Sequence, residues 1–203
     1  GAAAAVAYAA RHSERVSHLI LLAGYTHGLL HRNPSAQTLA FHEAQLKLIE
    51  LGWGRNDPGV QAMFTSRFMP GGNAEQIASF NEHQRLSCGG PRAAAIVRAK
   101  SEQDARALAA KVQAPTLVLH SEGDLVIPLA LGHELAASIP GARFELLRSR
   151  NHLPLPQEPA FERMCQVITE FVAQKPSPVQ LTPRERELAG LVGQGLDNLQ
   201  IAA

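Results

Sequence analysis

The chain has 203 residues, 45% of them hydrophobic and 18% charged, which is enough for one domain with a short appendage and excludes a disordered chain. Its formal net charge of +1 gives no global argument for nucleic-acid binding, and no apolar run approaches the ~20 residues of a transmembrane helix, so we expect no membrane partner. Two cysteines outside any CxxC spacing give no disulfide framework and are typical of a reducing compartment, which predicts a cytoplasmic location.

The first half of the chain contains a helix, a strand and one long insertion. Residues 1–12 are alanine-rich and free of proline, which favours a helix, and VSHLILLAG (16–24) is a short apolar run typical of a buried strand. From about residue 25 to 112 the chain holds Trp53, most of the phenylalanines and several proline or glycine breaks, with helical apolar spacing between them. We interpret this segment as a helical insertion.

A regular alternation follows the insertion. We expect a strand at 114–120, a helix at 128–139, a strand at 142–148 and a helix at 159–172. This order predicts an α/β fold, with a parallel sheet and crossover helices. Residues 174–180 are polar, contain two prolines and predict a linker to a separate unit at 181–203.

Two polar side chains follow neighbouring strands of the predicted sheet. Asp124 lies in HSEGDLVIP (120–128), after one strand, and His152 lies in SRNHLPL (149–155), after the next. Because the carboxyl ends of parallel strands meet at one edge of a sheet, the two side chains are expected within hydrogen-bond reach. A catalytic triad needs this pair, since the histidine moves the nucleophile's proton while the carboxylate fixes the histidine tautomer. We predict Asp124 as the acid and His152 as the base, with Glu122 as a rival acid.

These segments resemble the α/β-hydrolase superfamily. LVLHSEGDLVIP and RSRNHLPL are similar to its acid and histidine turns, and residues 1–24 are similar to the helix and strand that follow its nucleophile elbow. The resemblance covers roughly residues 1–173, about two-thirds of such a domain, and implies an α/β-hydrolase-like parallel sheet with a helical cap at about 25–112. It also implies serine-type hydrolysis of a small ester or acyl compound, with no cofactor.

The nucleophile of that family is not in this sequence. No G-x-S-x-G motif occurs in the 203 residues. In the resemblance, Gly1 matches the last glycine of the elbow, which places the serine and the oxyanion donors upstream. We therefore expect the chain to be a fragment of a longer protein and to lack serine-hydrolase turnover by itself.

The unit at 181–203 resembles the first helix and the start of the second helix of LuxR-type helix-turn-helix domains. It begins with the helix cap of LTPRE, turns at Gly195 and has a second capped start at Asp197, but the family's recognition helix would follow Ala203. Two functions therefore stay open: an enzyme with a small-molecule substrate, or a one-component transcriptional regulator that senses a small-molecule effector without turnover. DNA contact is expected only through the complete C-terminal domain, and a homodimer is left open.

Two further features of the insertion have competing interpretations. Its aromatic side chains either pack the core of the cap, which we favour, or line a substrate pocket; they are Trp53, Phe64, Phe68 and Phe80. His27 and His31 have helical spacing but lack the glutamate and third ligand of a zinc site, so no metal is expected.

Overall fold

The computed structural model describes residues 1–173, and the predicted linker at 174–180 and LuxR-like unit at 181–203 lie outside them. In chain order the elements are α1 (Ala2–Arg11), the 3₁₀ helix η1 (Ser13–Arg15), β1 (Leu19–Leu22), the 3₁₀ helix η2 (Leu29–His31), α2 (Ala36–Gly52), α3 (Pro58–Phe68), α4 (Ala74–Ser87), α5 (Gly90–Glu102), α6 (Arg106–Ala109), β2 (Thr116–Ser121), α7 (Leu129–Ser138), β3 (Arg143–Leu147) and α8 (Pro159–Ala173).

The three strands form a parallel sheet, as the sequence predicts, and their order in the sheet is β1-β2-β3. Leu19 of β1 lies opposite Thr116 of β2, and Leu117 of β2 lies opposite Arg143 of β3. Every residue of the central strand β2 is buried, because the strand has a neighbour on each side and helices over both faces. The carboxyl ends of all three strands therefore point to one edge of the sheet.

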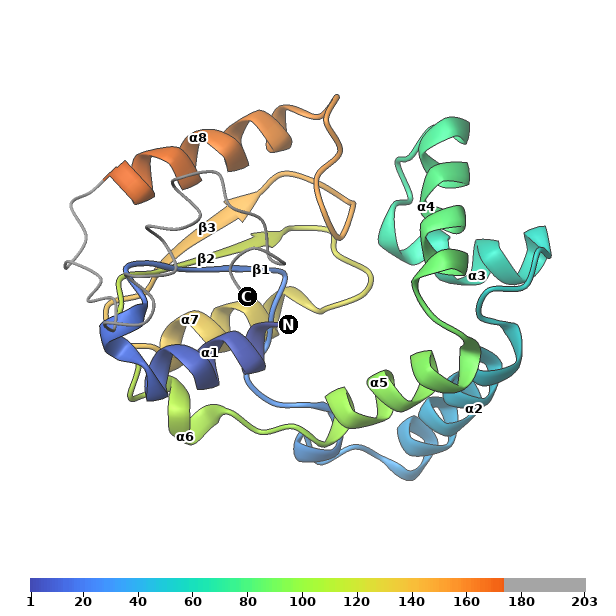
Figure 1. The fold of residues 1–203 in the computed structure, drawn as a ribbon, viewed down its shortest axis with the longest axis horizontal. Coiled ribbons are helices and arrows are strands. Elements are labelled where there is room, and N and C mark those ends of the chain that lie inside the picture. Colours follow the sequence, from blue (N-terminus) through green and yellow to red (C-terminus); the bar gives the residue numbers. More distant parts are fainter. Residues whose placement is uncertain (174–203) are drawn as a thin grey trace, which may run out of the picture.

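Helices cover the two faces of the sheet, with α1 and α7 on one face and α8 on the other (Figure 1). Side chains of β2 alternate between these layers: Val118 packs with α1 and α7, whereas Leu117 and Leu119 pack with α8. α8 turns an apolar stripe toward the sheet, since Val167 and Phe171 are buried in that second cluster. The sheet is thus the middle of three layers.

The helices α2 to α5 form a cap that stands beyond the strand ends, away from the sheet (Figure 1). Polar caps start three of them: Ser35 accepts a hydrogen bond from the backbone of Thr38, Asp57 precedes a proline, and Asn73 forms a capping box with Gln76. α2 and α5 pack against each other. None of the helices described between residues 1 and 173 has the length and hydropathy needed to cross a bilayer.

The cap joins the core through a narrow neck of two antiparallel backbone segments. His27 pairs with Asp104, and the amide of Gly28 donates to the carbonyl of Gln103 at 2.8 Å. A Cβ on Gly28 would lie 2.2 Å from the carbonyl oxygen of Lys100, so only glycine fits this approach. After the neck the chain returns to the core, where α6 packs on α1.

Candidate active site

The turns that carry the two predicted catalytic residues lie side by side at the carboxyl edge of the sheet. The acid turn follows β2, and the histidine turn follows β3. Backbone hydrogen bonds join them: the amide of Glu122 donates to Leu147 and that of Gly123 donates to Ser149, both at 2.9 Å. The parallel pairing of β2 and β3 thereby continues into the loops and fixes their relative position.

Asp124 has a fully buried carboxylate with three hydrogen-bond donors. Its Oδ2 lies 2.8 Å from Nδ1 of His152, and its Oδ1 accepts from the backbone amides of Val126 at 2.7 Å and Ile127 at 3.0 Å. Burial by itself raises the pKa of Asp124, but the hydrogen bonds from His152 and the two amides outweigh it, so the pKa lies below its ordinary value. The carboxylate is therefore ionised at neutral pH.

His152 presents one ring nitrogen to Asp124 and retains some access to solvent, with 17% of its side chain exposed. Since an ionised carboxylate only accepts, Nδ1 carries the proton in that hydrogen bond and Nε2 has the free lone pair. No hydrogen bond from residues 1–173 engages Nε2. The imidazole is thus held in the tautomer that a general base requires.

Glu158 anchors the histidine turn. One carboxylate oxygen accepts from the Ser149 hydroxyl at 2.9 Å, and the other accepts from the Asn151 amide at 2.9 Å and from the backbone N–H of Leu155 at 2.5 Å. Ser149, Asn151 and Leu155 are all buried. The sequence reasoning missed this residue, because a glutamate next to a helix start is an ordinary feature of a surface loop.

The cap contacts both the acid turn and the histidine turn through the end of α3 and the loop after it. Arg67 donates to the carbonyl of Leu125 in the acid turn at 2.6 Å. The carbonyl of Phe68 accepts from the backbone N–H of His152 at 2.8 Å, and the Phe68 ring lies edge-on to the imidazole at 5.2 Å. The amide of Gly71 donates to the Asn151 side chain at 2.9 Å. The position of the cap is therefore coupled to that of both catalytic turns.

His120 is a second histidine beside Asp124 that sequence reasoning did not single out. It is fully buried at the end of β2, its Nε2 lies 2.9 Å from the Ile127 carbonyl, and the same nitrogen lies 3.6 Å from Oδ2 of Asp124. A hydrogen bond from Nε2–H to Ile127 holds the backbone whose amide binds Asp124. The sequence feature that could have indicated His120 is its position as a histidine at the end of a continuous apolar strand.

The other sequence candidates lie outside this arrangement. Glu122 is exposed, whereas Asp124 is the carboxylate that contacts His152. His27 pairs with the Thr26 hydroxyl, and Nε2 of His31 lies 2.7 Å from the Glu102 carbonyl. Within the described part of the chain, no cluster of three His, Cys, Asp or Glu side chains is placed to hold a metal ion.

Two cavities meet between the cap and the strand ends. The first, the catalytic pocket, has a volume of about 450 Å³ and is bordered by His152, Gly1, Gly24 and Phe68. The second, the cap cavity, has a volume of about 1010 Å³ and lies between α2, α3 and α5. The cap aromatics pack in pairs, Trp53 with Phe64 and Phe68 with Phe80, and all but Phe80 also line the cap cavity.

Comparison with known proteins identifies the fold. No protein-family model and no curated protein matches the chain. Solved structures match it: a hydrolase from Oleispira antarctica with TM-score 0.64 and 16% identity, covering 82% of this chain and 60% of that chain. An enol-lactonase from Burkholderia xenovorans LB400 has TM-score 0.62 and 19% identity over 83% of this chain and 61% of that one. An esterase from Thermogutta terrifontis has TM-score 0.58 and 24% identity over 80% and 58%.

These matches define the class of fold: the chain has the α/β-hydrolase fold, with a parallel sheet and helices matching those of hydrolases and esterases. It spans about three-fifths of the length of each matched structure. At these identities the likeness concerns the fold, and chemistry has to be argued from the residues themselves.

Proposed function

We propose that Asp124 and His152 are the acid and base of a catalytic triad that hydrolyses a carboxylic ester or related acyl compound. The observation that carries the proposal is the 2.8 Å hydrogen bond between a fully buried carboxylate and an imidazole that borders the catalytic pocket. The matched structures, described as a hydrolase, an esterase and an enol-lactonase, support this class of chemistry.

The proposed nucleophile is a serine from the chain preceding Gly1. Three observations support this origin: the 203 residues contain no G-x-S-x-G, Gly1 and His152 border the same pocket, and the chain spans about three-fifths of the matched structures. Nε2 of His152 takes the serine proton as the oxygen attacks the carbonyl carbon, and returns it to the departing alcohol. Water then repeats the sequence on the acyl-enzyme, while Asp124 stays ionised and stabilises the imidazolium.

The test uses the protein expressed from its gene together with the sequence that precedes Gly1. We expect hydrolysis of p-nitrophenyl butyrate, a loss of about 10⁴-fold in kcat for Asp124→Asn and a loss of up to about 10⁶-fold for His152→Ala. The matched control is His83→Ala, an exposed histidine of α4. Wild-type rates in either site variant contradict the proposed roles, and we expect no turnover from residues 1–203 alone.

A second candidate function is a regulator in which the same fold senses a small-molecule effector. It rests on the LuxR-like pattern at 181–203, which lies outside the described residues. The residue at the upstream elbow separates the two functions: serine favours turnover, whereas alanine or glycine favours sensing. Effector-dependent binding of the complete protein to DNA, without ester hydrolysis, would decide for the regulator.

A further inference from the structure

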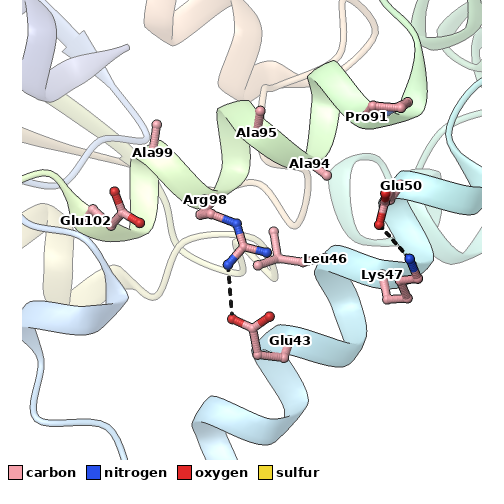
Figure 2. A pocket seen from close by; sticks show the side chains of 10 residues that line it. All are labelled: Glu43, Leu46, Lys47, Glu50, Pro91, Ala94, Ala95, Arg98, Ala99 and Glu102. Atoms are coloured by element: carbon pink, nitrogen blue, oxygen red, sulfur yellow. Dashed lines mark hydrogen bonds and ion pairs between the residues drawn. The ribbon is translucent and has the colours of Figure 1, made fainter.

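The two faces of the α2–α5 helix pair differ in how their charges are arranged. One face forms a shallow groove in which the charges are paired: Arg98 contacts Glu43 at 3.3 Å, and Lys47 contacts Glu50 at 2.9 Å. Figure 2 shows Arg98 of α5 reaching across this groove to Glu43 of α2. Each cation that lines this groove has an acidic partner close by, and Glu102 adds one further carboxylate, so the groove offers no unpaired cation to a ligand.

The opposite face of the same helix pair borders the cap cavity, whose charges are all positive. Among the described residues that line it, Arg67, Arg92 and Lys100 are cationic and none is acidic. Arg67 donates to the backbone carbonyl of Leu125 and forms no ion pair within residues 1–173. Arg92 and Lys100 form no ion pair within residues 1–173. The described lining of the cavity therefore carries an excess of positive charge.

Most of the remaining lining is apolar, and part of it is unusually exposed. Phe41, Met63 and Ile96 line the cavity with 63%, 55% and 45% of their surface exposed. Large apolar side chains that gather around a concave surface mark a ligand or interaction site more often than scattered ones do. A ligand that fits this lining has an apolar body together with a negative group.

The cap cavity adjoins the catalytic pocket. Phe68, Val97, Lys100 and Val126 border both cavities, and His152 borders the catalytic pocket. Resting on the proposed function, we propose that the cap cavity binds the non-reacting part of the substrate: a medium-length apolar chain that bears a carboxylate. The apolar part of the substrate lies against the aromatic and aliphatic walls of the cavity. The carboxylate is held by Arg92 and Lys100, the two cations of α5 that line it. The acyl carbon is then presented at the catalytic pocket.

Trp53, the single tryptophan of the 203 residues, lines the cap cavity, and its fluorescence reports binding without any turnover. Decanoate, decanol and decylamine share one apolar chain and differ in head group. Each probe is titrated below its micelle concentration. We expect decanoate to change Trp53 fluorescence saturably and to bind about tenfold more tightly than decanol, because each exposed ion pair raises the affinity by up to about fivefold. We expect decylamine to bind more weakly than decanol.

Two double variants with equal loss of charge complete the test. Arg92→Gln with Lys100→Gln should abolish the preference for decanoate, whereas Lys47→Gln with Arg98→Gln, on the groove of Figure 2, should leave it unchanged. Equal binding of all three probes, no saturable signal, or equal effects of both double variants overturns the inference. If the protein hydrolyses esters but does not bind decanoate, this inference is refuted and the proposed function stands. If it binds decanoate but does not hydrolyse esters, the proposed function is refuted and the ligand specificity of the cap cavity stands.

Discussion

Replacing Glu158 by alanine tests how the histidine turn is held. The change removes the acceptor of three hydrogen bonds, from the Ser149 hydroxyl, the Asn151 amide and the Leu155 backbone, and all three donors belong to buried residues. No other described side chain accepts from the Asn151 amide. The donors are left without partners in a place that excludes water, which is the costly outcome for a polar group.

The magnitude follows from the number of donors. A buried donor without an acceptor costs about 1–3 kcal/mol, and the three donors of Glu158 share one carboxylate, so their costs are not additive. We expect Glu158→Ala to lower the free energy of unfolding by about 3–5 kcal/mol. Glu158→Gln retains one acceptor oxygen and should fall between this variant and the wild type.

Urea unfolding followed by far-ultraviolet circular dichroism measures this change. Glu162→Ala is the matched control, since Glu162 is an exposed residue in the first turn of α8, and it should stay within about 0.5 kcal/mol of the wild type. A Glu158→Ala protein as stable as this control would refute the reasoning, because the three hydrogen bonds would then contribute nothing to the native state.

Three further changes test other contacts. Gly28→Ala places a Cβ 2.2 Å from a backbone carbonyl at the neck, so thermal unfolding should show a loss of about 2–3 kcal/mol; an unchanged melting temperature would contradict the close approach. Gly132→Ala places a Cβ 2.3 Å from Nδ1 of His120, and calorimetry together with ester hydrolysis should show lower stability and slower turnover, whereas a change in neither would mean that His120 does not position the acid turn. Asp124 has a pKa below its ordinary value of 3.8, so its stabilisation is complete above that pH and is lost as the pH falls through the lower native pKa. The stability difference between wild type and Asp124→Asn should shrink between neutral pH and about pH 2, and a constant difference would exclude this linkage.

The sheet and the positions of Asp124 and His152 were predictable because local patterns determine them. The segments expected as strands at 16–24, 114–120 and 142–148 become β1, β2 and β3, and the apolar run at 114–120 becomes the buried central strand between two helical layers. Once the strands are parallel, residues that follow two neighbouring strands must meet at one edge. The hydrogen bond between the two side chains follows from that topology.

The residues that hold the two turns in place were not predictable, because their contacts depend on how the cap packs against the core. Arg67 and Gly71 lie far from the catalytic turns in sequence, and nothing in their neighbours indicates that they contact Leu125 and Asn151. His120 is separated from Asp124 by only four residues, but its role depends on the path of the backbone at Ile127. The cations of the cap cavity likewise come together only when α3 and α5 are placed around one cavity.

The neck at His27 and Asp104 makes the cap an exchangeable unit. The chain leaves and re-enters the core at two backbone segments that are hydrogen-bonded to each other. The residues between them therefore form one closed loop, whose two ends stay at the same place on the core whatever its length. Cap sequences of other lengths can therefore be grafted between these two points without altering the strand order. A grafted cap has to keep the contacts that Arg67, Phe68 and Gly71 make with the two turns if the hydrogen bond between Asp124 and His152 is to stay in place.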